Sequence, residues 1–129
     1  MSDVANKVPS VTALSERHRS IDLRQGEIHE LLCDLEAMLA DRHSWFDLTR
    51  VQRRQLPAAQ PFYDLEDELE QLGHESARLV VDLHELPARS LIEAIAKLEV
   101  VARVIEPDDY PDAHALLTQA IAELTAAQH

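Results

Sequence analysis

The longest regular pattern in the chain is a heptad seam that begins at Phe62 and ends at Leu86. Its positions follow one another in alternating steps of three and four residues (Phe62, Leu65, Leu69, Leu72, Ser76, Leu79, Leu83 and Leu86). This spacing places all of them on one side of an α-helix about 37 Å long, at 1.5 Å per residue. Because an apolar seam needs a second helix to cover it, the pattern predicts a protein of packed helices.

The composition extends this prediction to the whole chain. Only 2 of the 129 residues are glycine, whereas folds built from strands need many turn residues with positive φ. Ala, Leu, Glu, Gln and Arg are abundant, and all five favour helix. We expect one all-α domain, a three- to four-helix antiparallel bundle with two long helices and two shorter ones (about 10–42, 62–86, 90–105 and 110–127).

Capping signals mark the ends of these helices. Ser10 or Thr12 is placed to cap the first helix, with a side-chain oxygen that accepts a hydrogen bond from a free backbone N–H. Ser90 and Glu93 form a capping box, in which each side chain satisfies the backbone N–H of the other. Asp109 is expected to cap the last helix.

Two segments fall outside the helical pattern. Residues 1–9 are expected to be a loose N-terminal tail, and residues 43–61 a connector that can contain one short helix over 47–55. The links after the second and third long segments are short, so the helices that they join should be antiparallel neighbours. The helix over 90–105 is apolar around most of its circumference, which predicts the most buried position in the bundle.

The unequal helix lengths leave part of the seam without cover. The two long helices exceed the two short ones by about 13 Å or more, and the third helix begins where the second ends. The half of the second helix near Phe62 and the facing half of the first helix therefore lack a neighbour. Leaving a large apolar side chain exposed there forgoes about 1.5–3 kcal/mol of stabilisation.

Two arrangements avoid this exposure. In one, the connector folds back and inserts Trp45, Phe46, Leu48 and Val51. In the other, this end of the protein pairs with a second chain, most simply in a symmetric homodimer. The two arrangements can combine, and we favour some oligomerisation. The expected interface is then formed by Leu31, Leu32, Leu35, Met38, Leu39, Trp45, Phe46, Phe62, Leu65 and Leu69.

The formal net charge of −12 limits the classes of partner. Direct binding to nucleic acid or to an anionic membrane surface needs cationic patches, and no apolar run approaches the roughly 18–20 residues of a membrane span. The first residues lack the features of a signal peptide. We therefore expect a cytoplasmic protein with a protein partner, and the ratio of ten Arg to two Lys indicates a GC-rich bacterial genome.

Carboxylates crowd the second helix (Asp64, Glu66, Asp67, Glu68, Glu70, Glu75 and Asp82). Most of them lie off the seam, which is typical of a hydrated helix face. Glu68, Glu75 and Asp82 share one heptad position, so they either pair with cations of a partner helix or remain hydrated. A second hypothesis makes this face functional, as an acidic decoy that occupies the basic groove of a nucleic-acid-binding protein.

Arg50, Arg53 and Arg54 form a basic tract in the connector, close to Trp45 and Phe46. Taken alone, such a tract resembles a surface that binds single-stranded nucleic acid. In so acidic a chain the tract is expected to contact carboxylates instead. These are either residues 64–70, in the second long helix of the same chain, or carboxylates of a neighbouring subunit.

The sequence carries no recognisable catalytic constellation, and no cofactor or metal is expected. A di-metal site in a bundle needs Glu-x-x-His motifs on facing helices, and the chain has none. Cys33 is the single cysteine, with no Lys or Arg one helical turn away to activate it, and the seven histidines do not converge. We expect a non-enzymatic module for protein–protein interaction or assembly.

Overall fold

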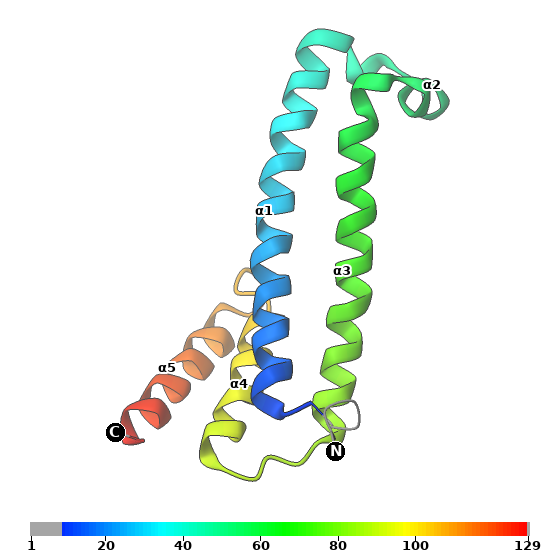
Figure 1. Cartoon of the computed structure of the whole chain (residues 1–129). Coiled ribbons are helices and arrows are strands. Elements are labelled where there is room, and N and C mark those ends of the chain that lie inside the picture. The colour runs from blue at the N-terminus through cyan, green and yellow to red at the C-terminus, as the bar shows by residue number, and fades with distance from the viewer. Residues whose placement is uncertain (1–8, 129) are drawn as a thin grey trace, which may run out of the picture. The chain divides into compact units, whose positions relative to one another are not determined.

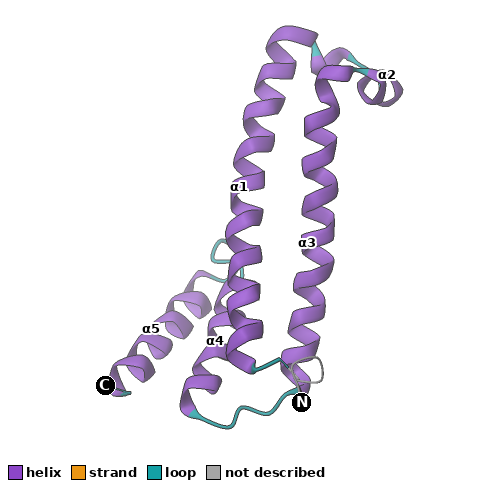
Figure 2. Cartoon of the chain, in the orientation of Figure 1, coloured by secondary structure: helices purple, strands orange, loops and turns teal. Residues whose placement is uncertain are grey.

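A computed structural model describes residues 9–128 and shows helices and no strands among them (Figures 1 and 2). The long elements are α1 (Val11–His43), α3 (Gln60–Glu85), α4 (Leu91–Val104) and α5 (Pro111–Ala127). The connector holds three short elements, η2 (Trp45–Asp47), α2 (Arg50–Gln55) and η3 (Pro57–Ala59). The all-α prediction is confirmed, and each long helix ends within two residues of its predicted limits. Except for Pro9, the predicted tail lies outside the described residues.

Two of the three predicted caps are present. Ser10 Oγ accepts a hydrogen bond from Ala13 N at 3.0 Å, and Ser90 Oγ accepts one from Glu93 N at 3.1 Å. Glu93 departs from the predicted box, because its carboxylate accepts from Arg89 N instead of Ser90 N.

The prediction that Asp109 caps the last helix is wrong. The residue before α5 is Tyr110, which makes no capping hydrogen bond through its side chain, and Pro111 occupies the first turn. Proline has a fixed φ suited to helix initiation and no N–H that needs an acceptor. Helix α5 therefore begins at the proline, and Asp109 lies in the preceding turn, with its N–H donated to Glu106 O.

The described chain divides into two compact units. Unit 1 joins the residues up to Ser20 to those from Ser76 onward, and unit 2 is Ile21–Glu75. Helices α1 and α3 each contribute residues to both units. The single domain expected from the sequence stays a prediction.

The core of unit 1 joins the start of α1 to the end of α3 and to α4. Its buried apolar residues are Val11, Leu83, Ala96 and Val100. Ser15 adds a polar link, because its hydroxyl donates a hydrogen bond to Ala96 O at 3.1 Å within this buried region. Helix α5 packs against α4 (Figure 1).

The helix over 90–105 was expected to be the most buried one, and α4 does have the largest share of buried residues among the long helices, three of 14. Helix α4 buries Ile95, Ala96 and Val100, but it leaves large apolar side chains exposed on other sides (Leu91, Ile92, Val101 and Val104). The described residues of unit 1 do not surround α4, because α5 and the ends of α1 and α3 cover only part of its circumference.

In unit 2, α1 and α3 run antiparallel and side by side, as expected (Figure 1). An ion pair joins them. Arg24 Nε donates to one Glu68 oxygen at 2.7 Å and Arg24 Nη2 donates to the other at 2.9 Å. Of the acids that share one heptad position (Glu68, Glu75 and Asp82), Glu68 therefore pairs with a cation of its own chain. Every residue of the heptad seam is buried or half-buried.

The Glu68 pair makes stability depend on pH. The hydrogen bonds from Arg24 lower the pKa of the Glu68 carboxyl below its ordinary value of 4.5. A carboxyl with a lowered pKa stabilises the fold above its ordinary pKa, and this contribution disappears as the pH falls through the lowered value. We expect Glu68→Gln to lower the melting temperature slightly at about pH 7 and to have no effect once wild-type Glu68 is protonated.

Thermal melts followed by circular dichroism at several pH values measure this difference. Glu70→Gln is the control, because Glu70 lies on the same helix, is exposed and has no ion pair among the described residues. An equal loss in both variants would show that the Arg24 pair contributes nothing specific.

Candidate functional site

The interface expected from the sequence is divided by the structure into buried and exposed residues. Leu39 and Trp45 are 0% and 1% exposed and form the core of unit 2 with Ala59. Leu31 and Phe46 are exposed, at 42% and 67%. The remaining members are half-buried (Leu32, Leu35, Met38, Phe62, Leu65 and Leu69). Leu39 and Trp45 are therefore covered by their own chain. The connector folds back over this end of α1 and α3.

The connector folds back immediately after α1. Ser44 adopts a left-handed conformation, with φ of 51°, and η2 then directs Trp45 into the core. The Trp45 ring meets Phe62 edge to face, with centroids 5.4 Å apart, and Tyr63 at 6.3 Å. Leu48 packs against this cluster, as expected of a folded-back connector, whereas Phe46 and Val51 remain exposed.

Helix α2 presents the three arginines of the connector. Thr49 Oγ1 accepts a hydrogen bond from Gln52 N at 3.1 Å, and Gln52 Oε1 accepts one from Thr49 N at 2.8 Å. This capping box fixes the start of a six-residue helix, too short to be stable alone. Residues i, i+3 and i+4 share one side of a helix, so Arg50, Arg53 and Arg54 emerge together.

Aromatic rings, not carboxylates, hold two of these arginines. Arg53 Nε donates to Trp45 O at 3.0 Å, and its guanidinium lies 4.5 Å from the centre of the Trp45 ring. The Arg54 guanidinium lies 4.0 Å from the centre of the Tyr63 ring. Cation–π contacts of this kind are worth about 0.5–2 kcal/mol.

The expected ion pairs between this tract and the acids of residues 64–70 in α3 are absent from the described part of the chain. Within residues 9–128, none of Arg50, Arg53 and Arg54 forms an ion pair. Arg53 and Arg54 stack on the rings of Trp45 and Tyr63 instead. The other part of the prediction, contact with carboxylates of another molecule, stays a prediction.

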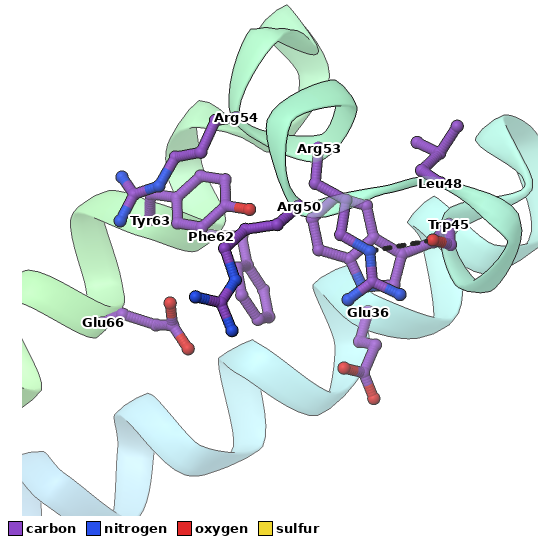
Figure 3. A pocket seen from close by; sticks show the side chains of 9 residues that line it. All are labelled: Glu36, Trp45, Leu48, Arg50, Arg53, Arg54, Phe62, Tyr63 and Glu66. Atoms are coloured by element: carbon purple, nitrogen blue, oxygen red, sulfur yellow. Dashed lines mark hydrogen bonds between the residues drawn. The ribbon is translucent and has the colours of Figure 1, made fainter.

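These residues surround a cavity of about 720 Å³ (Figure 3). Its lining comprises Glu36, Trp45, Leu48, Arg50, Arg53, Arg54, Phe62, Tyr63 and Glu66. The Arg50 side chain extends past Phe62 towards Glu66, and Glu36 lies on the side of Arg53. We call this cavity the arginine pocket.

The acidic face of α3 is mostly hydrated. Asp64, Glu66, Asp67 and Glu70 are exposed, while Glu75 and Asp82 are half-buried. Asp64 accepts a hydrogen bond from Gln60 Nε2 at 2.8 Å. Within residues 9–128, Asp64, Glu66, Asp67, Glu70 and Asp82 show no ion pair of the kind that Arg24 gives Glu68. Glu75 does have an interaction partner.

Unit 1 carries several cavities that were not predicted from the sequence. A groove of about 210 Å³ lies between the end of α3 and α4, lined by Val80, Leu83, His84, Lys97, Val100 and Val101. We call it the valine groove. Val80 and Val101 are 39% and 42% exposed, and Val104, one turn beyond Val100, is 53% exposed. The apolar circumference of α4 is the sequence feature that indicates this groove, although burial within the chain would produce the same pattern.

The remaining features concern metal ligands, the cysteine and the apolar character of the helices. No group of three or more His, Cys, Asp or Glu side chains is placed to hold a metal ion within residues 9–128. Cys33 is exposed and free. None of the helices in the described part of the chain has the length and apolar character needed to cross a bilayer.

The whole chain was also compared with known proteins. It matches no family model, and neither the curated proteins nor the solved structures give a significant match.

Proposed function

We propose that the protein is a non-enzymatic, cytoplasmic assembly module that forms a homodimer through the valine groove. The exposure of α4 carries this proposal. A helix that is apolar around most of its circumference is stable in water when neighbours cover its apolar sides, and α4 leaves Val101 and Val104 uncovered. Exposed apolar side chains that gather around a groove are typical of protein–protein contacts.

The charge of the chain argues for a second copy as the partner. Two molecules of net charge −12 repel each other unless their contact keeps carboxylates apart. The valine groove contains no Asp or Glu, and its two titratable residues are Lys97 and His84. Among the described cavities of unit 1, those lined by other residues include Glu or Asp. A symmetric contact here buries apolar surface without opposing like charges from the groove itself.

Stiff side chains suit such a contact. Val80, Val100 and Val101 are β-branched and have few rotamers to lose on association. In a two-fold contact each groove meets the same residues of the partner copy, so one substitution alters the interface twice.

Replacing Val101 with glutamate is expected to convert the dimer into a monomer. The substitution places two carboxylates in a symmetric apolar contact, where an unpaired charge is strongly unfavourable. Size-exclusion chromatography with light scattering measures the mass, and circular dichroism verifies that the helices persist. Wild type should have twice the mass of the variant.

Val51→Glu is the matched control, because Val51 is an exposed valine in unit 2, at 65%, and should leave the dimer intact. A monomeric wild-type protein at high concentration would exclude the homodimer. A dimer that survives Val101→Glu would exclude the valine groove as its interface.

A further inference from the structure

We infer that the arginine pocket is a binding site for a small organic carboxylate with a flat aromatic body. This site lies in unit 2 and is independent of the proposed assembly through unit 1. The inference depends on three observations: fixed cations without a carboxylate partner, an aromatic wall, and a buried donor without an acceptor.

The cations are the first observation. The chain has 24 acids against 12 bases, and Arg19 and Arg24 are examples of arginines that pair with a carboxylate. The three arginines of the pocket lack such a partner within residues 9–128. Arg53 and Arg54 are already fixed by stacking, so they lose little freedom when an anion binds.

The balance of charge in the lining selects the type of anion. Three arginines face two carboxylates, Glu36 and Glu66, which leaves one excess positive charge. A carboxylate carries one negative charge and matches the planar fork of a guanidinium. A phosphate monoester carries up to two negative charges, which one excess positive charge does not neutralise.

The shape of the pocket indicates the rest of the ligand. Its volume of about 720 Å³ lies within the usual range for small-molecule sites. Phe62 and Tyr63 are half-buried and meet edge to face, 5.6 Å apart, so parts of both rings remain open to a ligand. A flat aromatic group packs well against such a wall.

Trp45 gives the third observation. Its indole is 1% exposed, and Nε1 has no hydrogen-bond acceptor among the described residues. A buried donor without an acceptor is unfavourable. A ligand that supplies an acceptor would satisfy it. Trp45 is also the only tryptophan of the chain, so its signals report on this pocket alone.

Titration with phenylacetate, followed by Trp45 fluorescence and the indole N–H resonance, tests the inference. Concentrations up to about 10 mM are appropriate, because a ligand of this size binds in the millimolar range. We expect saturable changes with phenylacetate and none with phenylacetamide, which is similar in shape but uncharged. An equal response to the amide would overturn the assignment of the carboxylate.

Two variants identify the residues responsible. Arg50 is exposed and makes no stacking contact or hydrogen bond through its side chain within residues 9–128. Arg50→Gln should therefore preserve the fold while weakening binding about tenfold. Glu66→Gln removes a repulsive charge and should strengthen binding about twofold to threefold. Arg78→Gln is the control, because Arg78 is an exposed arginine in unit 1, and it should bind as wild type does.

Three results would refute the proposed site. They are saturable binding of inorganic phosphate without binding of phenylacetate, equal affinity of Arg50→Gln and Arg78→Gln, and the absence of any change in the Trp45 signals. Each readout is confined to unit 2, so a failed dimer in the previous experiment does not affect this one.

Discussion

Replacing Trp45 with alanine is expected to lower the free energy of unfolding by about 3–5 kcal/mol. Trp45 is the largest fully buried side chain of the described residues. It contacts Phe62 and Tyr63 and supports the guanidinium of Arg53. Alanine removes these contacts and leaves a cavity that the two rigid helices can fill only in part. Urea denaturation followed by circular dichroism measures the loss.

Phe46→Ala provides the comparison, because Phe46 is the adjacent aromatic residue and is 67% exposed. We expect this variant to change stability by no more than about 0.5 kcal/mol. Similar losses for the two variants would contradict the folded-back connector, because Trp45 would then be no more buried than its neighbour.

Replacing Arg103 with methionine is expected to lower the free energy of unfolding by about 2 kcal/mol. Arg103 Nε donates to His18 Nδ1 at 3.0 Å, and Arg103 Nη2 donates to Ser15 O at 3.0 Å. His18 is only 3% exposed, so water cannot readily replace the lost donor. Methionine retains much of the apolar length of the side chain, which limits the change to polar contacts.

Arg78→Met controls for the loss of one positive charge on a helix, since Arg78 is exposed on α3. It should leave the urea midpoint nearly unchanged. If Arg103→Met unfolds at the same urea concentration as Arg78→Met, the hydrogen bonds to His18 and Ser15 do not stabilise unit 1.

Local sequence determined what could be predicted of the fold. The seam positions, such as Leu65 and Leu79, are buried or half-buried as expected, because a spacing of three and four residues specifies both a helix and its inner face. The Ser90 cap was predictable for the same reason, since it involves residues three apart in sequence. Proline at position 111 overrode Asp109 because its ring favours the first turn of a helix more directly than a capping side chain does.

The sites depended on contacts that sequence patterns do not encode. The apolar circumference of α4 predicts that a neighbour covers it, but it does not specify whether that neighbour is the same chain or another. The arginines of α2 were expected to pair with carboxylates on the basis of charge alone. Their actual neighbours are the rings of Trp45 and Tyr63. This arrangement follows from the left-handed turn at Ser44, and serine is not a residue type that predicts such a turn.

The aromatic contact of Trp45 in unit 2 joins residues much closer along the chain than the buried hydrogen bond of Ser15 in unit 1 does. In unit 2, Trp45 meets Phe62 after 17 residues (62 − 45), whereas in unit 1 Ser15 must find Ala96, 81 residues away. Closing the longer loop costs about 1.4 kcal/mol more in chain entropy. During synthesis, the residues of unit 2 are therefore complete and able to fold while the start of α1 still waits for α4 to leave the ribosome.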